Sequence, residues 1–232
     1  MRCFLAPSRV AVAQCVTGAM LLMLACAASA GAQSRPPAGE LAASLQQRYA
    51  KVKDFSADFV HSYRGGALRT QVTERGNVLV KKPGKMRWTY TAPEKKTFVS
   101  DGVKMYSYIP QDRQVIVSNV PTGDEATTAV MFLAGKGDVT RDFTASYAEG
   151  GPAGTWMLKL VPRRAEREYD TLVLALDPAT LQIRALTTTD RQGGQSTFTF
   201  SNLKENRGLS DKEFAFRIPR GVDVITDGSV SR

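Results

Sequence analysis

Apolar residues recur every three or four positions near residue 41, which predicts an amphipathic helix. The residues that make this apolar face are Leu41, Leu45, Tyr49 and Val52. From Asp54 onward the period changes to two, as in a strand with one buried face. The pattern therefore predicts a helix followed by a mainly β domain of the α+β class.

Turn residues divide this alternating region into about ten strands. Arg64-Gly65-Gly66, Pro83-Gly84 and Asp101-Gly102 are among these turns. The expected strands cover residues 55–63, 68–80, 85–90, 95–100, 103–109, 114–118, 156–160, 172–176, 181–185, 198–200 and 214–218. Strands so close in sequence pair antiparallel through hairpins, and a sheet of this size is expected to curl into a barrel or half-barrel.

A second helix is expected to interrupt the strands at about Asp124. Thr122 and Glu125 match a capping box, and Gly135 suits the C-terminal end of a helix. Its apolar face consists of Ala126, Ala129, Val130 and Leu133, and it is widened by Met131 and Phe132. Two helices supply few apolar side chains to pack inside a curled sheet. Either an apolar cavity therefore remains, or side chains of the sheet itself fill the interior. The pattern alone leaves both outcomes open.

Met86, Trp88 and Tyr90 share one face of a predicted strand and are expected to line this cavity. The helix residues expected to cover it are Val130, Met131, Phe132 and Leu133. The remaining expected lining residues are Phe59, Val78, Val80, Tyr106 and Tyr108. The surplus of apolar side chains thus points to binding of a hydrophobic ligand.

The N-terminal 32 residues have the features of a signal peptide. Arg2 and Arg9 precede an uncharged apolar stretch of roughly a dozen residues, at positions 16–28. That stretch is short for a membrane span, which needs about 20 apolar residues. Two A-x-A sites follow, Ala28-Ser29-Ala30 and Ala30-Gly31-Ala32. Export to the periplasm is therefore expected.

We expect cleavage after Ala30 or Ala32, then a flexible lead-in over residues 33–39 and a single domain over residues 40–232. An uncleaved anchor is one alternative. Lipid attachment at Cys26 is another, although Met23-Leu24-Ala25-Cys26 is a poor lipoprotein box. An A-x-A cleavage favours a soluble mature protein.

Composition excludes several classes of chemistry. All three cysteines (Cys3, Cys15 and Cys26) lie in the segment expected to be removed, so the mature chain would have no thiol to serve as a nucleophile or metal ligand. Removing Arg2 and Arg9 would leave 29 basic and 22 acidic residues, a net charge of +7. The chain has no Lys/Arg block, and nucleic acid is not an expected partner of an exported protein.

The sequence carries no hydrolase, metalloprotease or nucleotide-binding motif. His61 is the single histidine, at an alternating strand position, and a structural role is the simpler interpretation for it. We therefore expect a protein without catalysis, metal or cofactor.

The segment Gly76-Asn77-Val78-Leu79-Val80-Lys81-Lys82-Pro83-Gly84-Lys85-Met86-Arg87-Trp88-Thr89-Tyr90 resembles the signature of the LolA family, the periplasmic carriers of lipoproteins. Val99-Ser100-Asp101-Gly102, Tyr106, Tyr108 and Pro110 continue the match. Residues 55–59, 132–133 and 214–222 also fit. The resemblance covers roughly residues 41–224, with a specific first block and a loose C-terminal half.

This resemblance implies an unclosed antiparallel β-barrel, or half-barrel, with a helical lid over a hydrophobic cavity. It also implies a monomer that binds the acyl chains of lipoproteins, receives them from an inner-membrane ABC transporter and passes them to an outer-membrane acceptor resembling LolB. In well-known members an arginine just before the proline holds the lid closed. Lys82 occupies that place here, so the resemblance makes Lys82 the lid latch, with a compact ammonium in place of a planar guanidinium.

Three other functions stay open at this point. The same fold could carry another lipid or glycolipid, or serve as a LolB-like receptor anchored through Cys26. A module that senses mislocalised lipoprotein would need a further partner-binding domain, for which little length remains. A lipid hydrolase would need a nucleophile motif, which the sequence lacks.

Overall fold

Twelve strands of the described residues form one continuous sheet. The computed structural model describes residues 35–65, 71–120, 132–166 and 168–226. Residues 36–232 form one compact unit. The expected signal peptide and most of the second expected helix therefore lie outside the described residues.

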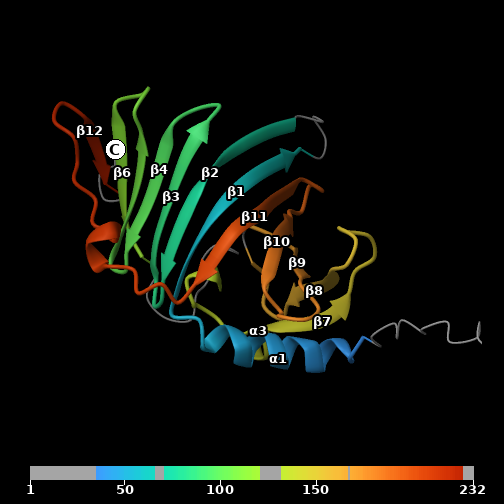
Figure 1. The fold of residues 1–232 in the computed structure, drawn as a ribbon. Helices are drawn as coiled ribbons and strands as arrows, with labels where there is room; N and C mark the ends of the chain where they lie inside the picture. The colour runs from blue at the N-terminus through green and yellow to red at the C-terminus, as the bar shows by residue number, and fades with distance from the viewer. Residues whose placement is uncertain (1–34, 66–70, 121–131, 167, 227–232) are drawn as a thin grey trace, which may run out of the picture. The chain divides into compact units, whose positions relative to one another are not determined.

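The sheet has the strand order β12-β6-β5-β4-β3-β2-β1-β11-β10-β9-β8-β7 (Figure 1). Its elements are α1 (Ala38–Ala50), β1 (Asp54–Arg64), β2 (Gln71–Lys81), β3 (Lys85–Ala92), β4 (Lys96–Asp101), β5 (Lys104–Ile109), β6 (Gln114–Asn119), α3 (Val139–Asp142), β7 (Phe143–Tyr147), β8 (Trp156–Pro162), β9 (Thr171–Leu176), β10 (Ile183–Thr189), β11 (Gln195–Glu205), the 3-10 helix η1 (Asp211–Phe214) and β12 (Asp223–Thr226). All neighbours pair antiparallel except β12 and β6, which are parallel. β7 and β12 form the two edges and do not pair with each other, so the sheet is unclosed.

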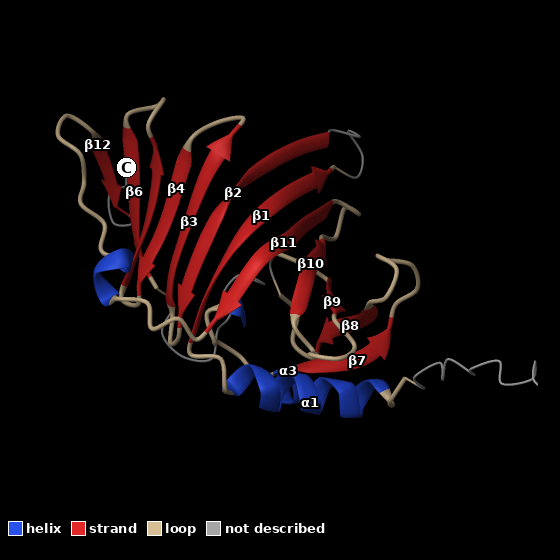
Figure 2. Ribbon diagram, viewed as in Figure 1, coloured by secondary structure: helices blue, strands red, loops and turns tan. Residues whose placement is uncertain are grey.

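The sheet curves so that its two halves face each other, and α1 lies across the end of the half that contains β7 and β8 (Figure 2). Leu41, Leu45 and Tyr49 on α1 are buried, as the helical period predicts. The helix begins at Ala38, which lies inside the segment expected to be a flexible lead-in. Of the second expected helix, Phe132 and Leu133 are described, and both are helical.

The expected strand over residues 214–218 is wrong. Ser210 and Glu213 form a capping box that begins η1. The residues after Phe214 contact the outer face of the sheet through Ala215 and Phe216. Arg87 donates hydrogen bonds to the backbone carbonyls of Glu213 and Ala215, which occupies acceptors that a strand would use. The alternation of Phe214 and Phe216 reflects packing on the sheet below, because Phe216 contacts Tyr106 and Tyr108. Strands β7 and β12 were not expected, since both are short.

Strand register sorts the side chains onto two faces. Trp88 lies opposite Phe98, and Phe98 lies opposite Ser107, so these three share the inner face. The next row along the same strands, which contains Val99 and Tyr106, points to the outer face. The inner face therefore carries the apolar side chains that a ligand in the curl would meet.

Candidate functional site

An aromatic cluster occupies the middle of the inner face. The ring of Phe59 on β1 lies 5.1 Å from Trp88 and 4.9 Å from Tyr90, both on β3, and 5.9 Å from Phe198 on β11. Phe98 on β4 extends the cluster at 5.6 Å from Tyr90. These edge-to-face contacts are favourable geometries for aromatic rings. The cluster joins strands from both halves of the sheet into one apolar floor.

A short segment, residues 132–135, covers the end of this floor next to α1, and we call it the closing segment. The ring of Phe132 stacks on Tyr49 of α1, with centroids 5.5 Å apart. The Tyr49 hydroxyl donates to the Leu133 carbonyl at 2.6 Å. The Gly84 amide, in the turn between β2 and β3, donates to the Ala134 carbonyl at 2.9 Å. The closing segment is thus held by contacts from α1 and from the β2–β3 turn.

Lys82 lies where the β2–β3 turn, the end of α1 and the closing segment meet. Its ammonium donates to the Tyr49 carbonyl, near the C-terminal end of α1, and lies 3.4 Å from the centroid of the Tyr49 ring. Its stem packs so closely on Gly135 that a Cβ there would come within 2.8 Å of Lys82 Cδ. Burial lowers the pKa of Lys82 to about 8, so these contacts offset only part of the lost hydration of the ammonium. The ammonium meets a helix C-terminus, where a cation is favoured.

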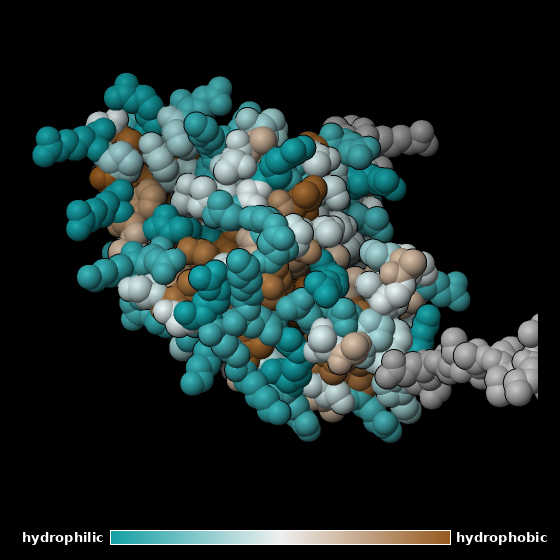
Figure 3. All heavy atoms as spheres, in the orientation of Figure 1, coloured by the Kyte–Doolittle hydropathy of each residue, from teal (hydrophilic) through white to brown (hydrophobic). Residues whose placement is uncertain are grey.

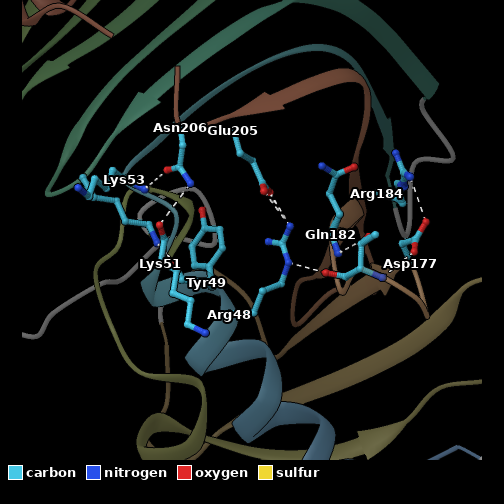
Figure 4. Close-up of polar contacts among 11 residues, drawn as sticks. Arg48, Tyr49, Lys51, Lys53, Asp177, Gln182, Arg184, Glu205 and Asn206 are labelled. Atoms are coloured by element: carbon cyan, nitrogen blue, oxygen red, sulfur yellow. Dashed lines mark hydrogen bonds and ion pairs between the residues drawn. The ribbon is translucent and has the colours of Figure 1, made fainter. Parts of the chain in front are cut away.

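Further polar contacts fix the end of α1 against the sheet (Figure 4). Arg48 donates to both carboxylate oxygens of Glu205 on β11, at 2.8 and 3.0 Å, and to the Thr180 carbonyl in the β9–β10 turn. The Asn206 side chain accepts from the Lys53 amide at 2.7 Å. Both bonds to Glu205 come from Arg48 Nη2, and the bond to Thr180 comes from Nε, so the planar guanidinium is held from two directions. The helix end that carries Tyr49 is therefore a rigid platform for the closing segment.

The inner face is filled on one side and open on the other. Near α1, side chains pack into one buried core that contains Phe55, Val80 and Leu133. Over β3 to β6 an apolar pocket of 170 Å³ remains, lined among others by Met86, Phe98, Met105 and Ile116. Figure 3 shows apolar residues between hydrophilic ones in the middle of the face toward the viewer. Both outcomes that the sequence allowed are therefore present, in different halves of the curl.

Most of the predicted lining residues come together. Phe59, Val78, Val80, Met86, Trp88, Tyr90, Phe132 and Leu133 all belong to the one buried core. The rings of Tyr106 and Tyr108 pack against Phe216 on the outer face. Tyr106 nevertheless borders the apolar pocket over β3 to β6. Val130 and Met131 lie outside the described residues.

Trp88 carries an unusual feature for so buried a residue. Its side chain is 3% exposed, and its indole N–H has no hydrogen-bond partner among the described residues. A buried donor without a partner costs about 1–3 kcal/mol. Such a cost is expected at places where a ligand or water supplies the missing acceptor.

Sequence reasoning missed a polar cluster at the rim of the inner face. His61 Nδ1 lies 3.1 Å from Glu74 Oε2, and its Nε2 lies 2.8 Å from Ser196 Oγ. The other carboxylate oxygen of Glu74 accepts from Lys96 at 2.6 Å. Burial lowers the pKa of His61, which outweighs the opposite effect of Glu74, so the ring is neutral at pH 7. No local motif could show this cluster, because Ser196 lies 135 positions from His61.

Within the described residues, neither clustered metal ligands nor a membrane-spanning helix occurs. No group of three or more His, Cys, Asp or Glu side chains gathers there as metal ligands would. None of the helices in the described part has the length and apolar content needed to cross a bilayer.

The inner face is aromatic and lies beside an open apolar pocket, and the closing segment is held by few polar contacts. This arrangement is typical of a protein that binds an apolar ligand in a half-open sheet. Residues 50–217 match the family described as "Outer membrane lipoprotein carrier protein LolA". The match spans most of the chain, and the chain therefore belongs to the LolA family.

Individual relatives agree with this assignment. An outer-membrane lipoprotein carrier protein of Bordetella avium is 31% identical over 78% of this chain and 85% of the relative. One from Chromohalobacter salexigens is 29% identical over 85% of this chain and 90% of the relative. Among solved structures, an uncharacterized conserved protein from Thermus thermophilus superposes with a TM-score of 0.50 at 13% identity, covering 81% of this chain and 97% of that one. That last likeness concerns the fold alone.

Proposed function

We propose that this protein is a periplasmic carrier that takes up the acyl chains of lipoproteins released from the inner membrane and delivers them to the outer membrane. The observation that carries the proposal is the aromatic inner face, continuous with an open apolar pocket, in a member of a family named for this transport. Burying one methylene is favourable by about 0.8 kcal/mol, so exposing an acyl chain of some fifteen methylenes to water would cost roughly 12 kcal/mol. The chain therefore has to be shielded while it crosses the periplasm.

Transport of this kind makes and breaks no covalent bond, and it requires no cofactor. The donor would be an ABC transporter that extracts lipoproteins from the inner membrane, and the acceptor would be a LolB-like protein at the outer membrane. The names of the relatives from Bordetella avium and Chromohalobacter salexigens support the outer membrane as the destination. A carrier that works alone as a monomer fits a cavity built within one chain.

The function is tested by incubating the purified mature protein, with ATP, with inner membranes that contain a lipoprotein and its releasing ABC transporter. We expect lipoprotein to appear in the soluble fraction in complex with the carrier, and Trp88 emission to change on binding, because Trp88 belongs to the apolar floor. Trp156 also emits, so Trp88→Phe should lose the change while Trp156→Phe keeps it. Soluble complexes without a Trp88-dependent change would contradict the placement of the ligand. Absence of any complex would contradict the function itself.

Export is expected to leave a soluble protein without an acyl anchor. Because the A-x-A sites are better matches than the sequence before Cys26, the mature N-terminus should be Gly31 or Gln33. Intact mass spectrometry of the periplasmic protein measures this directly. A diacylglyceryl group on Cys26 would instead indicate an anchored receptor.

A further inference from the structure

The rim of the inner face combines a fixed polar cluster with a second cavity. A pocket of 310 Å³ opens there, lined on its polar side by Tyr63, Glu168, Thr188, Asp190, Ser196 and His61. Its apolar side is formed by Leu186, Phe198 and Tyr169. A cavity with one polar and one apolar side suits the region where an amphiphile changes from tail to head.

This pocket is continuous with the aromatic floor through Phe198. The Phe198 ring stacks on His61 at 4.1 Å with an interplanar angle of 4°, and it also lies 5.1 Å from Trp88. His61 follows Phe59 by two residues on β1, so both side chains share the inner face. An acyl chain lying on the floor would therefore bring its polar end to His61 and Ser196.

The polar cluster is preorganised before any ligand binds. Glu74, only 8% exposed, is held between Lys96 and His61, and this carboxylate fixes the His61 ring with its Nε2 toward Ser196. Because the neutral His61 ring donates from Nδ1 to Glu74, the Ser196 hydroxyl donates to Nε2, and its oxygen is left as an acceptor toward the pocket. The Thr188 hydroxyl lines the pocket as a donor. Groups fixed in this way set the positions of a ligand's amide N–H, which Ser196 accepts, and of its ester carbonyl oxygen, to which Thr188 donates, at little entropic cost.

We propose that this pocket is the subsite for the ester and amide groups that join the acyl chains of a lipoprotein to its N-terminal cysteine, so that the tails point along the aromatic floor toward the apolar pocket over β3 to β6 and the head lies at Ser196. The proposal rests on the carrier function above and adds the direction in which the bound lipid lies, with its head in this pocket. The head it fits is uncharged, because the carboxylates of Glu168 and Asp190 line the same pocket and repel a phosphate.

Ser196, His61 and Glu74 also have the order of a nucleophile, a base and an orienting acid. Hydrolysis needs, in addition, donors for the oxyanion, which are usually backbone N–H groups. At Ser196, β11 is paired on both sides, with Tyr63 on β1 and with Thr188 on β10, so its backbone N–H groups belong to the sheet. The arrangement therefore favours binding of an ester over its cleavage.

The test compares two synthetic lipopeptides that differ only in how their chains are attached, one by ester and amide bonds and one by ether bonds. We expect the natural protein to bind the ester form about five- to tenfold more tightly, as one or two hydrogen bonds allow. Ser196→Ala should reduce this preference, because it removes the acceptor of the amide N–H, and should leave affinity for the ether form unchanged. An ester lipid of the same chain length with an anionic phosphate head should bind more weakly than the ester lipopeptide.

Ser62→Ala is the matched control, because Ser62 neighbours His61 on β1 but points to the opposite face. It should keep the ester preference. Equal affinity of the natural protein for both lipopeptides would overturn the subsite while leaving the carrier function intact, since the chains would still bind. Release of free fatty acid that stops in Ser196→Ala would overturn a purely binding role. Binding of an apolar dye reports separately on whether the aromatic floor accepts an apolar ligand. A protein that does not bind the dye would count against the carrier function itself.

Discussion

Lys82→Leu is expected to accept lipoprotein normally but to transfer it to the acceptor at least tenfold more slowly. Leucine keeps apolar packing beside Gly135 and removes the hydrogen bond from the ammonium to the Tyr49 carbonyl. A hydrogen bond that involves a charged group contributes about 1.5–3 kcal/mol, which biases an open–closed equilibrium by tenfold or more. Without it, the closed, empty state is less favoured, and release of the cargo recovers less free energy.

The measurement is a relay of donor membranes, carrier variant and acceptor, with lipoprotein quantified at each stage. Lys82→Arg is the control and should transfer at least as well as the natural protein, because guanidinium stays protonated and donates in a planar fork. Transfer by Lys82→Leu at the natural rate would show that Lys82 is a packed surface lysine without a role in closure.

A pH dependence should accompany this latch. Burial in the closed state lowers the pKa of Lys82 from 10.5 to about 8, so the open protein binds this proton more tightly than the closed one. Raising the pH from about 7 to 9 therefore favours the closed state, in which a neutral amine still donates to the Tyr49 carbonyl. Dye entry should slow over this range in the natural protein and stay constant in Lys82→Arg. Equal pH profiles for the two proteins would contradict the burial of Lys82 on closing.

Gly76→Ala is expected to lower the free energy of unfolding by about 3 kcal/mol. A Cβ at this position would lie 2.1 Å from the Thr89 carbonyl oxygen and 2.9 Å from Phe59 Cζ. The first neighbour is backbone in the paired strand β3, so β2 and β3 must separate to admit even one methyl group. The Phe59 ring, which lies over the glycine, would also leave its place in the aromatic floor.

Gly39→Ala is the matched control, because the same methyl group meets nothing within 4 Å in α1. It should raise stability by about 0.5–1 kcal/mol, since alanine is the better helix former. Urea unfolding of the two variants measures both changes. A loss below about 1 kcal/mol for Gly76→Ala would show that the contact between β2 and β3 is loose at this point.

Much of the fold was predictable because it follows from local periodicity. One example is the helical face that contains Leu41 and Leu45, and another is the alternation of Met86, Trp88 and Tyr90. Each pattern can be recognised within one helix or one strand. Alternation predicts which side chains share a face, so the aromatic floor could be expected in part. The family resemblance, which rests on the block from Gly76 to Tyr90, was readable in the same way and is confirmed.

Alternation could not tell which of two apolar faces looks inward. Tyr106 and Tyr108 were placed in the cavity, yet they pack on the outer face because the chain after η1 returns there and covers them. The same return explains the wrong strand at residues 214–218, whose apolar period records burial against a sheet and not pairing within it. Both differences concern contacts between segments about a hundred residues apart, for which local sequence carries no signal.

The sequence by itself therefore determined the mainly β class, the apolar surplus that a ligand needs, and a lysine just before Pro83. Only the tertiary structure decided how those parts work together. It brought the Lys82 ammonium to the Tyr49 carbonyl and joined His61, Glu74 and Ser196 into one cluster. The physical reason is that secondary structure arises from interactions within a few residues, whereas sites arise where strand register and chain reversal bring distant side chains within hydrogen-bonding distance.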